Sequence, residues 1–164
     1  MTKKTTANKL GALATALSDA IADGFGDLSP SAASALLTLR QSEPLGTTEL
    51  AQVVGLSQPA CTRMVDRLVA DALVERQPAQ GRTVPIVLTD QGRRLGELIQ
   101  ARRLAVLRAV SDGLDKKERK DFDRLLEKLL AAVPLAGATP RRACRLCDYR
   151  LCDGKGCPHT LSPA

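Results

Sequence analysis

The chain has 164 residues, of which 44% are hydrophobic and 26% are charged, a balance typical of one folded soluble domain. With two Phe, one Tyr and no Trp, aliphatic side chains must fill the core, which favours helices over sheets and argues against a base-stacking platform for single-stranded nucleic acid. The single histidine, His159, lies near the C-terminal end. A Ser/His/Asp triad or a His-rich metal centre in the body of the chain is therefore excluded, and we expect the protein not to be an enzyme.

The net charge of +6 is a mild indication of an anionic partner. Half of this excess lies after residue 135, where five basic and two acidic residues occur. No apolar run reaches the roughly 18 residues that a membrane helix needs, and Asp19 and Asp23 interrupt the Leu/Ala-rich N-terminal stretch. We therefore expect a cytoplasmic protein with no membrane association, in which thiols stay reduced.

Two helices are predicted at the N-terminal end. A first helix ends near Gly24, and a second begins with the capping residue Ser29 followed by Pro30 and ends at Pro44 and Gly46. The apolar residues of the first helix recur at helical spacing; they are Leu10, Leu13, Leu17 and Ile21.

A helix-turn-helix follows. A short helix opens at Thr47 or Thr48, Gly55 supplies the left-handed residue that ends it, and Ser57 caps a helix that runs to about Ala72. At 100° per residue, one stripe of this second helix is apolar; it holds Cys61, Met64, Val65, Leu68 and Ala72. The opposite face can contact phosphates and base edges; it holds Pro59, Thr62, Arg63, Asp66 and Arg67. From periodicity alone, a solvated surface helix with an Arg/Asp/Arg charge pattern is the better interpretation.

Two short extended runs, 74–77 and 83–88, predict a hairpin whose tip carries Arg82. Val84, Ile86 and Leu88 alternate toward one face of it. Arg82 could enter a minor groove, where negative potential attracts guanidinium groups; the alternative is an ordinary exposed loop arginine.

Two further helices close the predicted body. Thr89 and Asp90 begin a long helix that ends around Gly113, and Asp115 and Glu118 have capping-box spacing for a last one. The long helix has an apolar side with Leu95, Leu98, Ile99 and Val106. The last helix has a continuous apolar face with Phe122, Leu125, Leu126, Leu129, Leu130 and Val133.

Residues 56–76, LSQPACTRMVDRLVADALVER, and residues 82–92, RTVPIVLTDQG, resemble the recognition helix and wing of the MarR family of transcription regulators, and the resemblance covers about residues 10–133. It implies a mainly α fold with a small β-wing, a winged helix-turn-helix dimerised through its N- and C-terminal helices. It also implies a homodimer, predicted to be a repressor, that binds double-stranded DNA at a pseudo-palindromic operator. By position, the resemblance implies DNA contacts from Ser57, Gln58, Pro59, Thr62, Arg63, Arg67 and Arg82.

One departure from the family pattern concerns the wing. Many members carry an aspartate two residues before the wing arginine, whereas Gln80 stands here. The ion pair that usually orients the wing is therefore absent or replaced. Members commonly respond to phenolic or other small ligands, and some to thiol oxidation; the inward position of Cys61 favours a buried core residue over an oxidation switch.

The C-terminal sequence CRLCDYRLCDGKGCPH places Cys144, Cys147, Cys152 and Cys157 in the pattern C-x2-C-x4-C-x4-C. This is zinc-knuckle spacing with cysteine in the histidine position, and four thiolates suit tetrahedral zinc. An iron-sulfur cluster is the alternative centre, because four thiolates satisfy either, and a flexible tail with reactive thiols is the alternative to metal binding. His159 could replace one ligand.

These patterns predict four parts: N-terminal helices (1–45), a DNA-binding lobe (46–92), C-terminal dimerisation helices (93–134) and a linker with the cysteine-rich tail (135–164). The leading hypothesis is a DNA-binding regulator modulated by metal or redox state at the tail, or by a small-molecule effector. The alternative is a metal-binding or thiol-redox interaction protein without specific DNA binding.

Overall fold

The computed structural model describes residues 2–133 and 140–151. In chain order its elements are α1 (Lys3–Asp23), α2 (Pro30–Ser42), α3 (Thr47–Val54), α4 (Gln58–Ala70), β1 (Val74–Arg76), β2 (Ile86–Leu88), α5 (Asp90–Ser111), α6 (Lys116–Ala132), α7 (Pro140–Ala143) and the 3-10 turn η1 (Tyr149–Leu151). The predicted fold class, mainly helical with a two-stranded wing, is confirmed.

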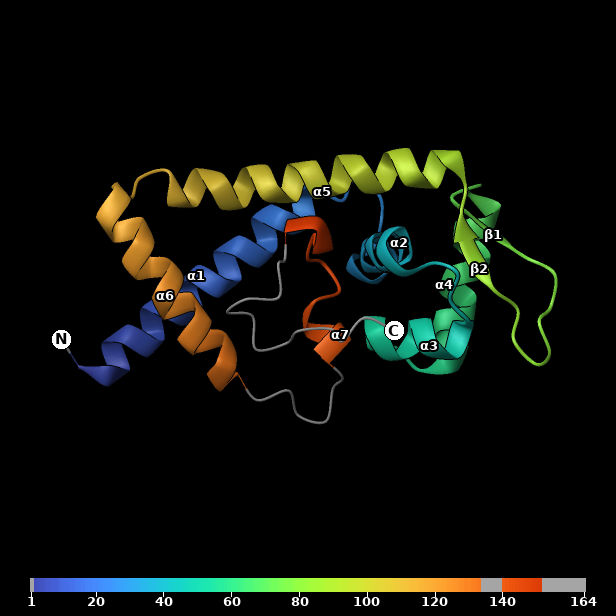
Figure 1. Cartoon of the computed structure of the whole chain (residues 1–164), viewed down its shortest axis with the longest axis horizontal. Helices are drawn as coiled ribbons and strands as arrows, with labels where there is room; N and C mark the ends of the chain where they lie inside the picture. Colours follow the sequence, from blue (N-terminus) through green and yellow to red (C-terminus); the bar gives the residue numbers. More distant parts are fainter. Residues whose placement is uncertain (1, 134–139, 152–164) are drawn as a thin grey trace.

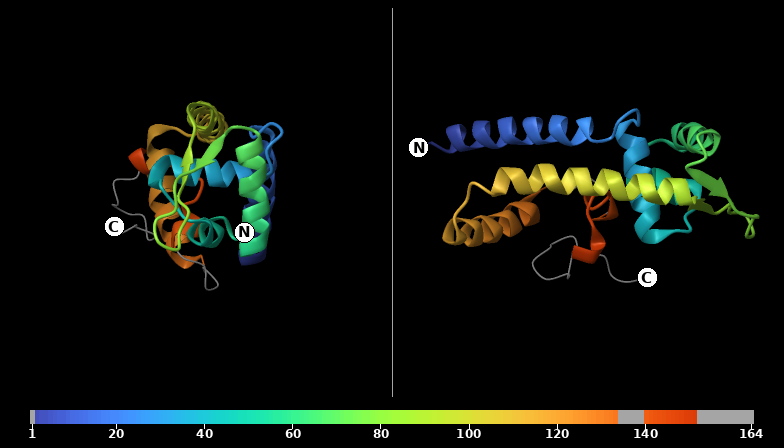
Figure 2. Two further views of the ribbon diagram at one scale, coloured as in Figure 1. Left: turned by 90° about the vertical axis from the view of Figure 1, so that its right-hand side faces the viewer. Right: turned by 90° about the horizontal axis from the view of Figure 1, so that it is seen from above.

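The molecule is elongated, with a compact lobe at one end of the long helix α5 (Figure 1). The lobe consists of α2, α3, α4 and the β1–β2 wing, which projects from its outer end. Helices α1 and α6 extend away from the lobe toward the other end of α5, and α1 runs beside α5 (Figure 2).

The predicted helix starts are confirmed at the level of their hydrogen bonds. The Ser29 hydroxyl accepts the Ala32 N–H at 3.2 Å, which begins α2 with Pro30 in its first turn. At the start of α6, Asp115 and Glu118 form a reciprocal capping box. These caps fix where the helices begin, because they satisfy N–H groups that have no partner inside the helix.

The hydrophobic core is centred on α2, in which the eight consecutive residues 32–39 are buried. Helices α3, α4 and α5 and strand β2 pack around it. Phe25 is the only aromatic side chain in the described core, so aliphatic residues fill the core as predicted.

The wing is a two-stranded antiparallel sheet in which Val74 faces Leu88 and Arg76 faces Ile86. On its other side Ile86 exchanges both backbone hydrogen bonds with Leu45, at 2.9 and 3.2 Å. This second pairing joins the wing to the segment before α3.

Three residues of the predicted apolar faces are exposed. Val84 is exposed because β2 starts only at Ile86 and the preceding loop leaves the core surface. Ala72 lies beyond the end of α4, where its φ of +54° turns the chain. Leu98 is exposed on α5 because the described chain packs nothing on that side of the helix.

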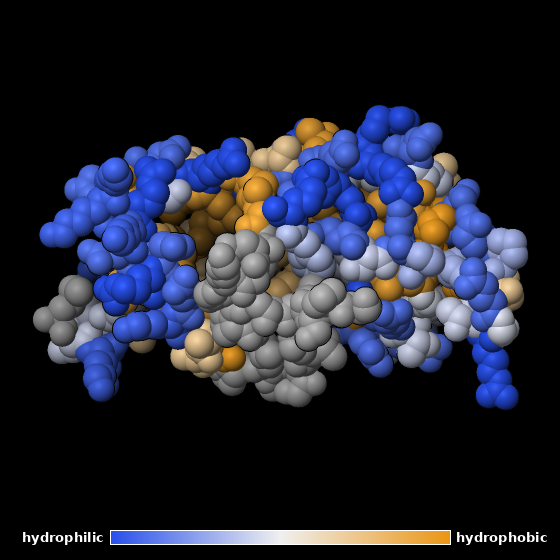
Figure 3. Space-filling model, in the orientation of Figure 1, coloured by the Kyte–Doolittle hydropathy of each residue, from blue (hydrophilic) through white to orange (hydrophobic). Residues whose placement is uncertain are grey.

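Large apolar side chains are also exposed on the helices outside the lobe. On α6 and just after it they are Phe122, Leu125, Leu126, Leu129, Leu130 and Val133, with exposed fractions of 37–53%. Leu10 and Leu13 on α1 are exposed as well, and apolar surface is visible between the hydrophilic side chains in Figure 3. Along the described residues, no helix combines the length and apolar character that crossing a membrane requires.

Candidate nucleic-acid interface

The turn between α3 and α4 is built by residues 55–57. Gly55, at φ +77°, ends α3 and donates its N–H to the Ala51 carbonyl at 2.9 Å. A left-handed residue at this point suits glycine, which has no Cβ to clash with the backbone. The Ser57 hydroxyl then accepts the Ala60 N–H at 3.4 Å and caps α4. The predicted helix-turn-helix is confirmed by this geometry.

Helix α4 buries one face and exposes the other, as its periodicity predicts. Cys61, Met64, Val65 and Leu68 are its buried residues. All the predicted DNA-contacting residues of the helix and its cap are exposed; they are Ser57, Gln58, Pro59, Thr62, Arg63 and Arg67. The structure thus brings these six side chains to the solvent side of one helix.

Local hydrogen bonds order part of this face. The Gln58 amide donates to the Thr48 hydroxyl at 3.1 Å, which ties α4 to the first turn of α3. The Thr62 hydroxyl donates to the Gln58 carbonyl at 3.0 Å. Among the described residues, Arg63 and Arg67 form no salt bridge, so their guanidinium groups are available to an external anion.

Asp66 is the one acidic residue on the exposed face of α4. The sequence did not predict its ion-pair partner. Arg76 of β1 donates to the Asp66 carboxylate at 2.7 Å. An unpaired carboxylate here would repel phosphate groups, and the Arg76 guanidinium offsets that charge. The ten-residue separation crosses from helix to strand, so no local sequence signal marks the pair.

Arg82 is exposed at the tip of the wing, next to Gly81 with φ +62°. The tip is closed by two backbone hydrogen bonds between Gln80 and Thr83, at 2.8 and 3.1 Å. Near this tip the wing loop approaches the start of α3 so closely that a Cβ on Gly46 would lie 2.7 Å from the Thr83 methyl group. Backbone pairing and this contact therefore orient the wing in a chain that has Gln80 in place of the family's aspartate.

Cys61 is fully buried among the core residues of the lobe. Burial raises the pKa of the Cys61 thiol above its ordinary value, because a thiolate is poorly solvated there. Low exposure and low thiolate content both disfavour oxidation. The prediction that Cys61 is a core residue is confirmed.

Of the four tail cysteines, only Cys144 and Cys147 lie in the described part of the chain; Cys152, Cys157 and His159 lie outside it. Cys144 is buried and Cys147 is half-buried. Within residues 2–133 and 140–151, no three Cys, His, Asp or Glu side chains gather into a group that could hold a metal ion. The four-cysteine metal site stays a prediction.

Residues 140–151, which we call the latch segment, pack against α2 and α3. Gln41 of α2 donates to the Cys147 carbonyl and accepts the Tyr149 N–H, both at 2.5 Å. Asp148 is buried and accepts two hydrogen bonds from the Arg150 side chain, which lowers the pKa of its carboxyl group. The sequence did not predict the hydrogen bonds of Gln41 to the latch segment, because Gln41 lies 106 residues before Cys147.

A pocket of about 490 Å³ lies between α2, α5 and the latch segment; it is lined by Arg40, Gln41, Arg93, Glu97, Tyr149 and Arg150. Three arginines face one glutamate in this lining. Arg93 also pairs with Glu43, just outside the pocket. Arg40 lies 4.0 Å from Glu97, and Arg150 pairs with Asp148, so each of the three arginines has a carboxylate partner that an anionic ligand would have to replace.

Comparisons with known proteins agree with this geometry. Residues 28–81 match the MarR family model. A MarR family protein from Bacillus stearothermophilus is 27% identical, with a TM-score of 0.69 over 79% of this chain and 95% of that one. No curated protein sequence matches the chain significantly.

Two more distant solved structures share the fold. RV1404 from Mycobacterium tuberculosis is 23% identical, with a TM-score of 0.70 over 80% of this chain and 94% of that one. MepR, a transcription regulator of the Staphylococcus aureus multidrug efflux pump MepA, is 17% identical, with a TM-score of 0.70 over 82% of this chain and all of that one. The segment that matches the MarR family model, residues 28–81, runs from the start of the lobe to the wing tip, and the described chain shares the winged-helix fold of these solved structures.

Proposed function

We propose that the protein is a sequence-specific, double-stranded DNA-binding transcription regulator that acts in the cytoplasm as a homodimeric repressor and not as an enzyme. The observation that carries the proposal is the exposed face of α4, which presents unpaired arginines beside an arginine-tipped wing in a chain whose residues 28–81 match the MarR family model. An exposed helix of this kind fits a major groove, and a wing arginine fits the adjacent minor groove.

The side chains of the interface divide by role. We propose that Arg63 and Gln58 read base edges, since arginine pairs bidentately with guanine and glutamine with adenine. Thr62, Arg67 and Ser57 would position the helix on phosphates, Pro59 would start the helix at its contact with DNA, and Arg82 would enter the minor groove.

The homodimer is supported by the exposed apolar side chains of α6 and α1, which a soluble monomer would leave in water. A second copy offers the same surface, so a twofold interface would bury both. Two lobes related by a twofold axis would then read the two halves of a pseudo-palindromic operator.

The pocket beside the latch segment is the place we propose for a small-molecule effector. A small aromatic carboxylate or phenolate would bind there by replacing the carboxylate partner of a lining arginine, such as Glu43 on Arg93. Binding of salicylate, measured by titration calorimetry with and without Arg93→Ala, tests this assignment.

For the tail we propose a zinc ion held by Cys144, Cys147, Cys152 and Cys157, with an iron-sulfur cluster as the alternative. The Cys147 N–H donates to the Cys144 carbonyl at 2.8 Å, and so tight a turn suits two ligands of one tetrahedral ion. Zinc would supply structural cross-linking of the tail. Metal analysis and the visible spectrum of the purified protein separate zinc from a coloured cluster, and a metal-free protein contradicts both.

The direct test of the function is selection of duplexes from a random library, followed by affinity measurements at two salt concentrations. Arg63→Ala should cost about 1–3 kcal/mol on the selected site and relax its base preference. Arg82→Ala should weaken binding more evenly across sequences. Arg108 is an exposed arginine on α5 outside the lobe. Arg108→Ala is therefore the matched control and should bind DNA with the affinity of the parent.

Failure to select any preferred sequence would contradict the proposal. The alternative is a metal-binding or thiol-redox interaction protein. It would be favoured if the parent binds no DNA and if a variant lacking both Arg63 and Arg67 keeps its metal and its protein partners.

A further inference from the structure

The latch segment is anchored on α2 through the side chain of Gln41. The amide of this glutamine both donates to the Cys147 carbonyl and accepts from the Tyr149 N–H. One side chain thereby satisfies two backbone groups of the latch segment, in the way that a neighbouring strand would. Hydrogen bonds to partly buried backbone groups are costly to lose, because no equivalent partner replaces them.

The same segment contacts both ends of α3. The Arg141 guanidinium lies 2.7 Å from the Glu49 carboxylate in the first turn of α3. The Arg142 guanidinium lies over Gly55, so close that a Cβ there would be 2.6 Å from it. A cation at this end of α3 faces the carbonyl groups that carry the negative end of the helix dipole.

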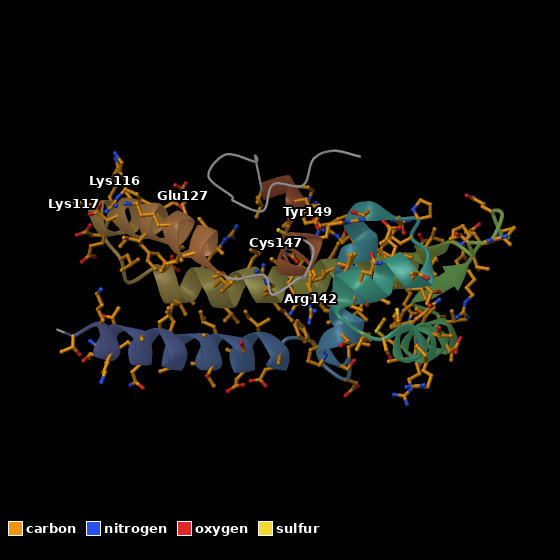
Figure 4. The ribbon with its side chains drawn as sticks, turned by 90° about the horizontal axis from the view of Figure 1, so that it is seen from below. Lys116, Lys117, Glu127, Arg142, Cys147 and Tyr149 are labelled. Atoms are coloured by element: carbon orange, nitrogen blue, oxygen red, sulfur yellow. The ribbon has the colours of Figure 1, made fainter. Side chains whose placement is uncertain are left out.

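Gly55 is the first residue of the turn between α3 and α4, so Arg142 touches the element that sets the angle between the two helices of the DNA-binding motif. Figure 4 shows Arg142, Cys147 and Tyr149 gathered in the middle of the molecule, between α6 and the lobe, and far from Lys116 and Lys117 at the outer end of α6. The latch segment therefore contacts the motif itself and not only the helices outside the lobe.

Burial shows that this contact is a packed interface. Leu146 packs against the hydrophobic core of the lobe, and Cys144 and Asp148 are only 7% and 8% exposed. A group the size of a maleimide adduct on Cys144 would have no room in this position. Attachment of such a group requires the residues packed around Cys144 to move apart.

We propose that the latch segment braces the helix-turn-helix, so that its docked position strengthens DNA binding and its release weakens DNA binding. The part that concerns DNA rests on the proposed function. Linkage makes the effect reciprocal: DNA binding favours the docked latch segment and protects Cys144 from modification.

The first experiment needs no DNA. The reduced, chelator-treated full-length protein is alkylated with N-ethylmaleimide, and modification of Cys144 is followed by peptide mass spectrometry. The thiolate adds across the maleimide double bond, forming one S–C bond while the adjacent carbon takes up a proton, so no oxidant is involved. We expect Gln41→Ala to accelerate Cys144 alkylation about tenfold, because two hydrogen bonds to the segment are lost. Gln91→Ala, an exposed glutamine on α5, is the control and should alkylate at the parent rate.

The second experiment measures affinity for the selected duplex by fluorescence anisotropy. We expect Gln41→Ala, and the parent alkylated at Cys144, to bind at least about fivefold more weakly than the unmodified parent. We also expect excess duplex to slow alkylation of Cys144 in the parent. If Gln41→Ala is alkylated faster but binds the duplex within twofold of the parent affinity, the proposal that the latch segment strengthens DNA binding is wrong.

A third variant guards against a general folding defect. Arg141→Glu should accelerate alkylation of Cys144, and Arg141→Glu combined with Glu49→Arg should restore protection by rebuilding the ion pair in reverse. If the parent, Gln41→Ala and Arg141→Glu are alkylated at equal rates, the docked position of the latch segment is itself refuted. If Cys144 of the parent is alkylated slowly but the parent binds no duplex preferentially, the proposed DNA-binding function is wrong, while docking of the latch segment on the lobe is supported.

Discussion

Gly92→Ala is expected to separate helix α5 from the end of the recognition helix. Gly92 lies in the first turn of α5, and its N–H donates to the capping hydroxyl of Thr89 at 3.0 Å. A Cβ on Gly92 would lie 1.9 Å from the Leu73 carbonyl oxygen and 2.9 Å from its carbon. Both atoms belong to the backbone, so no side-chain rotation can relieve the clash, and α5 must move away from the segment that follows α4.

The expected cost is large for a single methyl group. Overpacking a well-packed site costs roughly 1–3 kcal/mol, and a clash with fixed backbone belongs at the upper end of that range. The same Leu73 carbonyl accepts the Thr89 N–H at 3.1 Å, and this hydrogen bond would be strained too. A loss of about 3 kcal/mol corresponds to a fall in melting temperature of roughly 10 °C in a protein of this size.

The assay is thermal unfolding of the parent, Gly92→Ala and Gly96→Ala by circular dichroism. Gly96 lies one turn further along the same helix, and its Cβ would meet only ordinary contacts, at 3.6 Å from the Arg40 side chain and 4.0 Å from the Leu36 carbonyl. Alanine is the better helix former by up to about 1 kcal/mol, so Gly96→Ala should raise the melting temperature. The reasoning is refuted if Gly92→Ala melts within 2 °C, about 0.5 kcal/mol, of the parent.

Four further predictions test separate parts of the structure. Ala72→Gly should raise the unfolding free energy by about 0.5–1 kcal/mol and Ala72→Val should lower it, because φ is +54° at this position; urea unfolding measures both. Burial raises the pKa of the Cys61 thiol, so folded protein keeps a proton that the unfolded chain loses, and stability should fall as pH rises past the ordinary thiol pKa. Urea midpoints from about pH 7 to about pH 10 should show this extra decline in the parent relative to Cys61→Ala. Leu126→Glu should convert dimer to monomer in sedimentation velocity, since it places a charge within the exposed apolar face of α6. Arg76→Ala should weaken DNA binding by leaving Asp66 unpaired on the DNA-facing side, and adding Asp66→Asn should recover most of the loss.

The features that the sequence predicted well are those decided within a few residues. The cap at Ser29, the left-handed Gly55 and the pairing of Asp115 with Glu118 each depend on groups at most three or four positions apart. Such interactions form in the same way whatever surrounds the helix, so their sequence signatures carry over to the folded protein.

The sequence did not predict which side chains of an apolar face are covered by another segment. Leu98 and Val84 have the right spacing for a buried face, but burial depends on whether another segment lies over them, and none of the described segments does. Two contacts could not be predicted for a similar reason, since each joins segments that no periodicity relates. They are the pairing of Asp66 with Arg76 and the anchoring of residues 140–151 by Gln41. The exposed polar face of α4 was predictable from its periodicity, whereas the ion pair between Asp66 and Arg76 on that face was not.

The end of α2 also links the pocket to the wing, through Glu43. One carboxylate oxygen of Glu43 accepts the Leu88 N–H of β2 at 2.7 Å, and the other pairs with Arg93 in the wall of the pocket. An anionic effector that draws Arg93 toward itself would weaken its hold on Glu43 and hence the hydrogen bond that fixes β2. We therefore expect an effector carboxylate to lower the DNA affinity of the parent but to have little effect on Glu43→Gln, whose neutral amide does not depend on Arg93. Anisotropy titrations of both proteins, with and without salicylate, measure this difference. An equal response of the two proteins, with salicylate bound to both, would show that the signal reaches the DNA-binding lobe by a route other than Glu43.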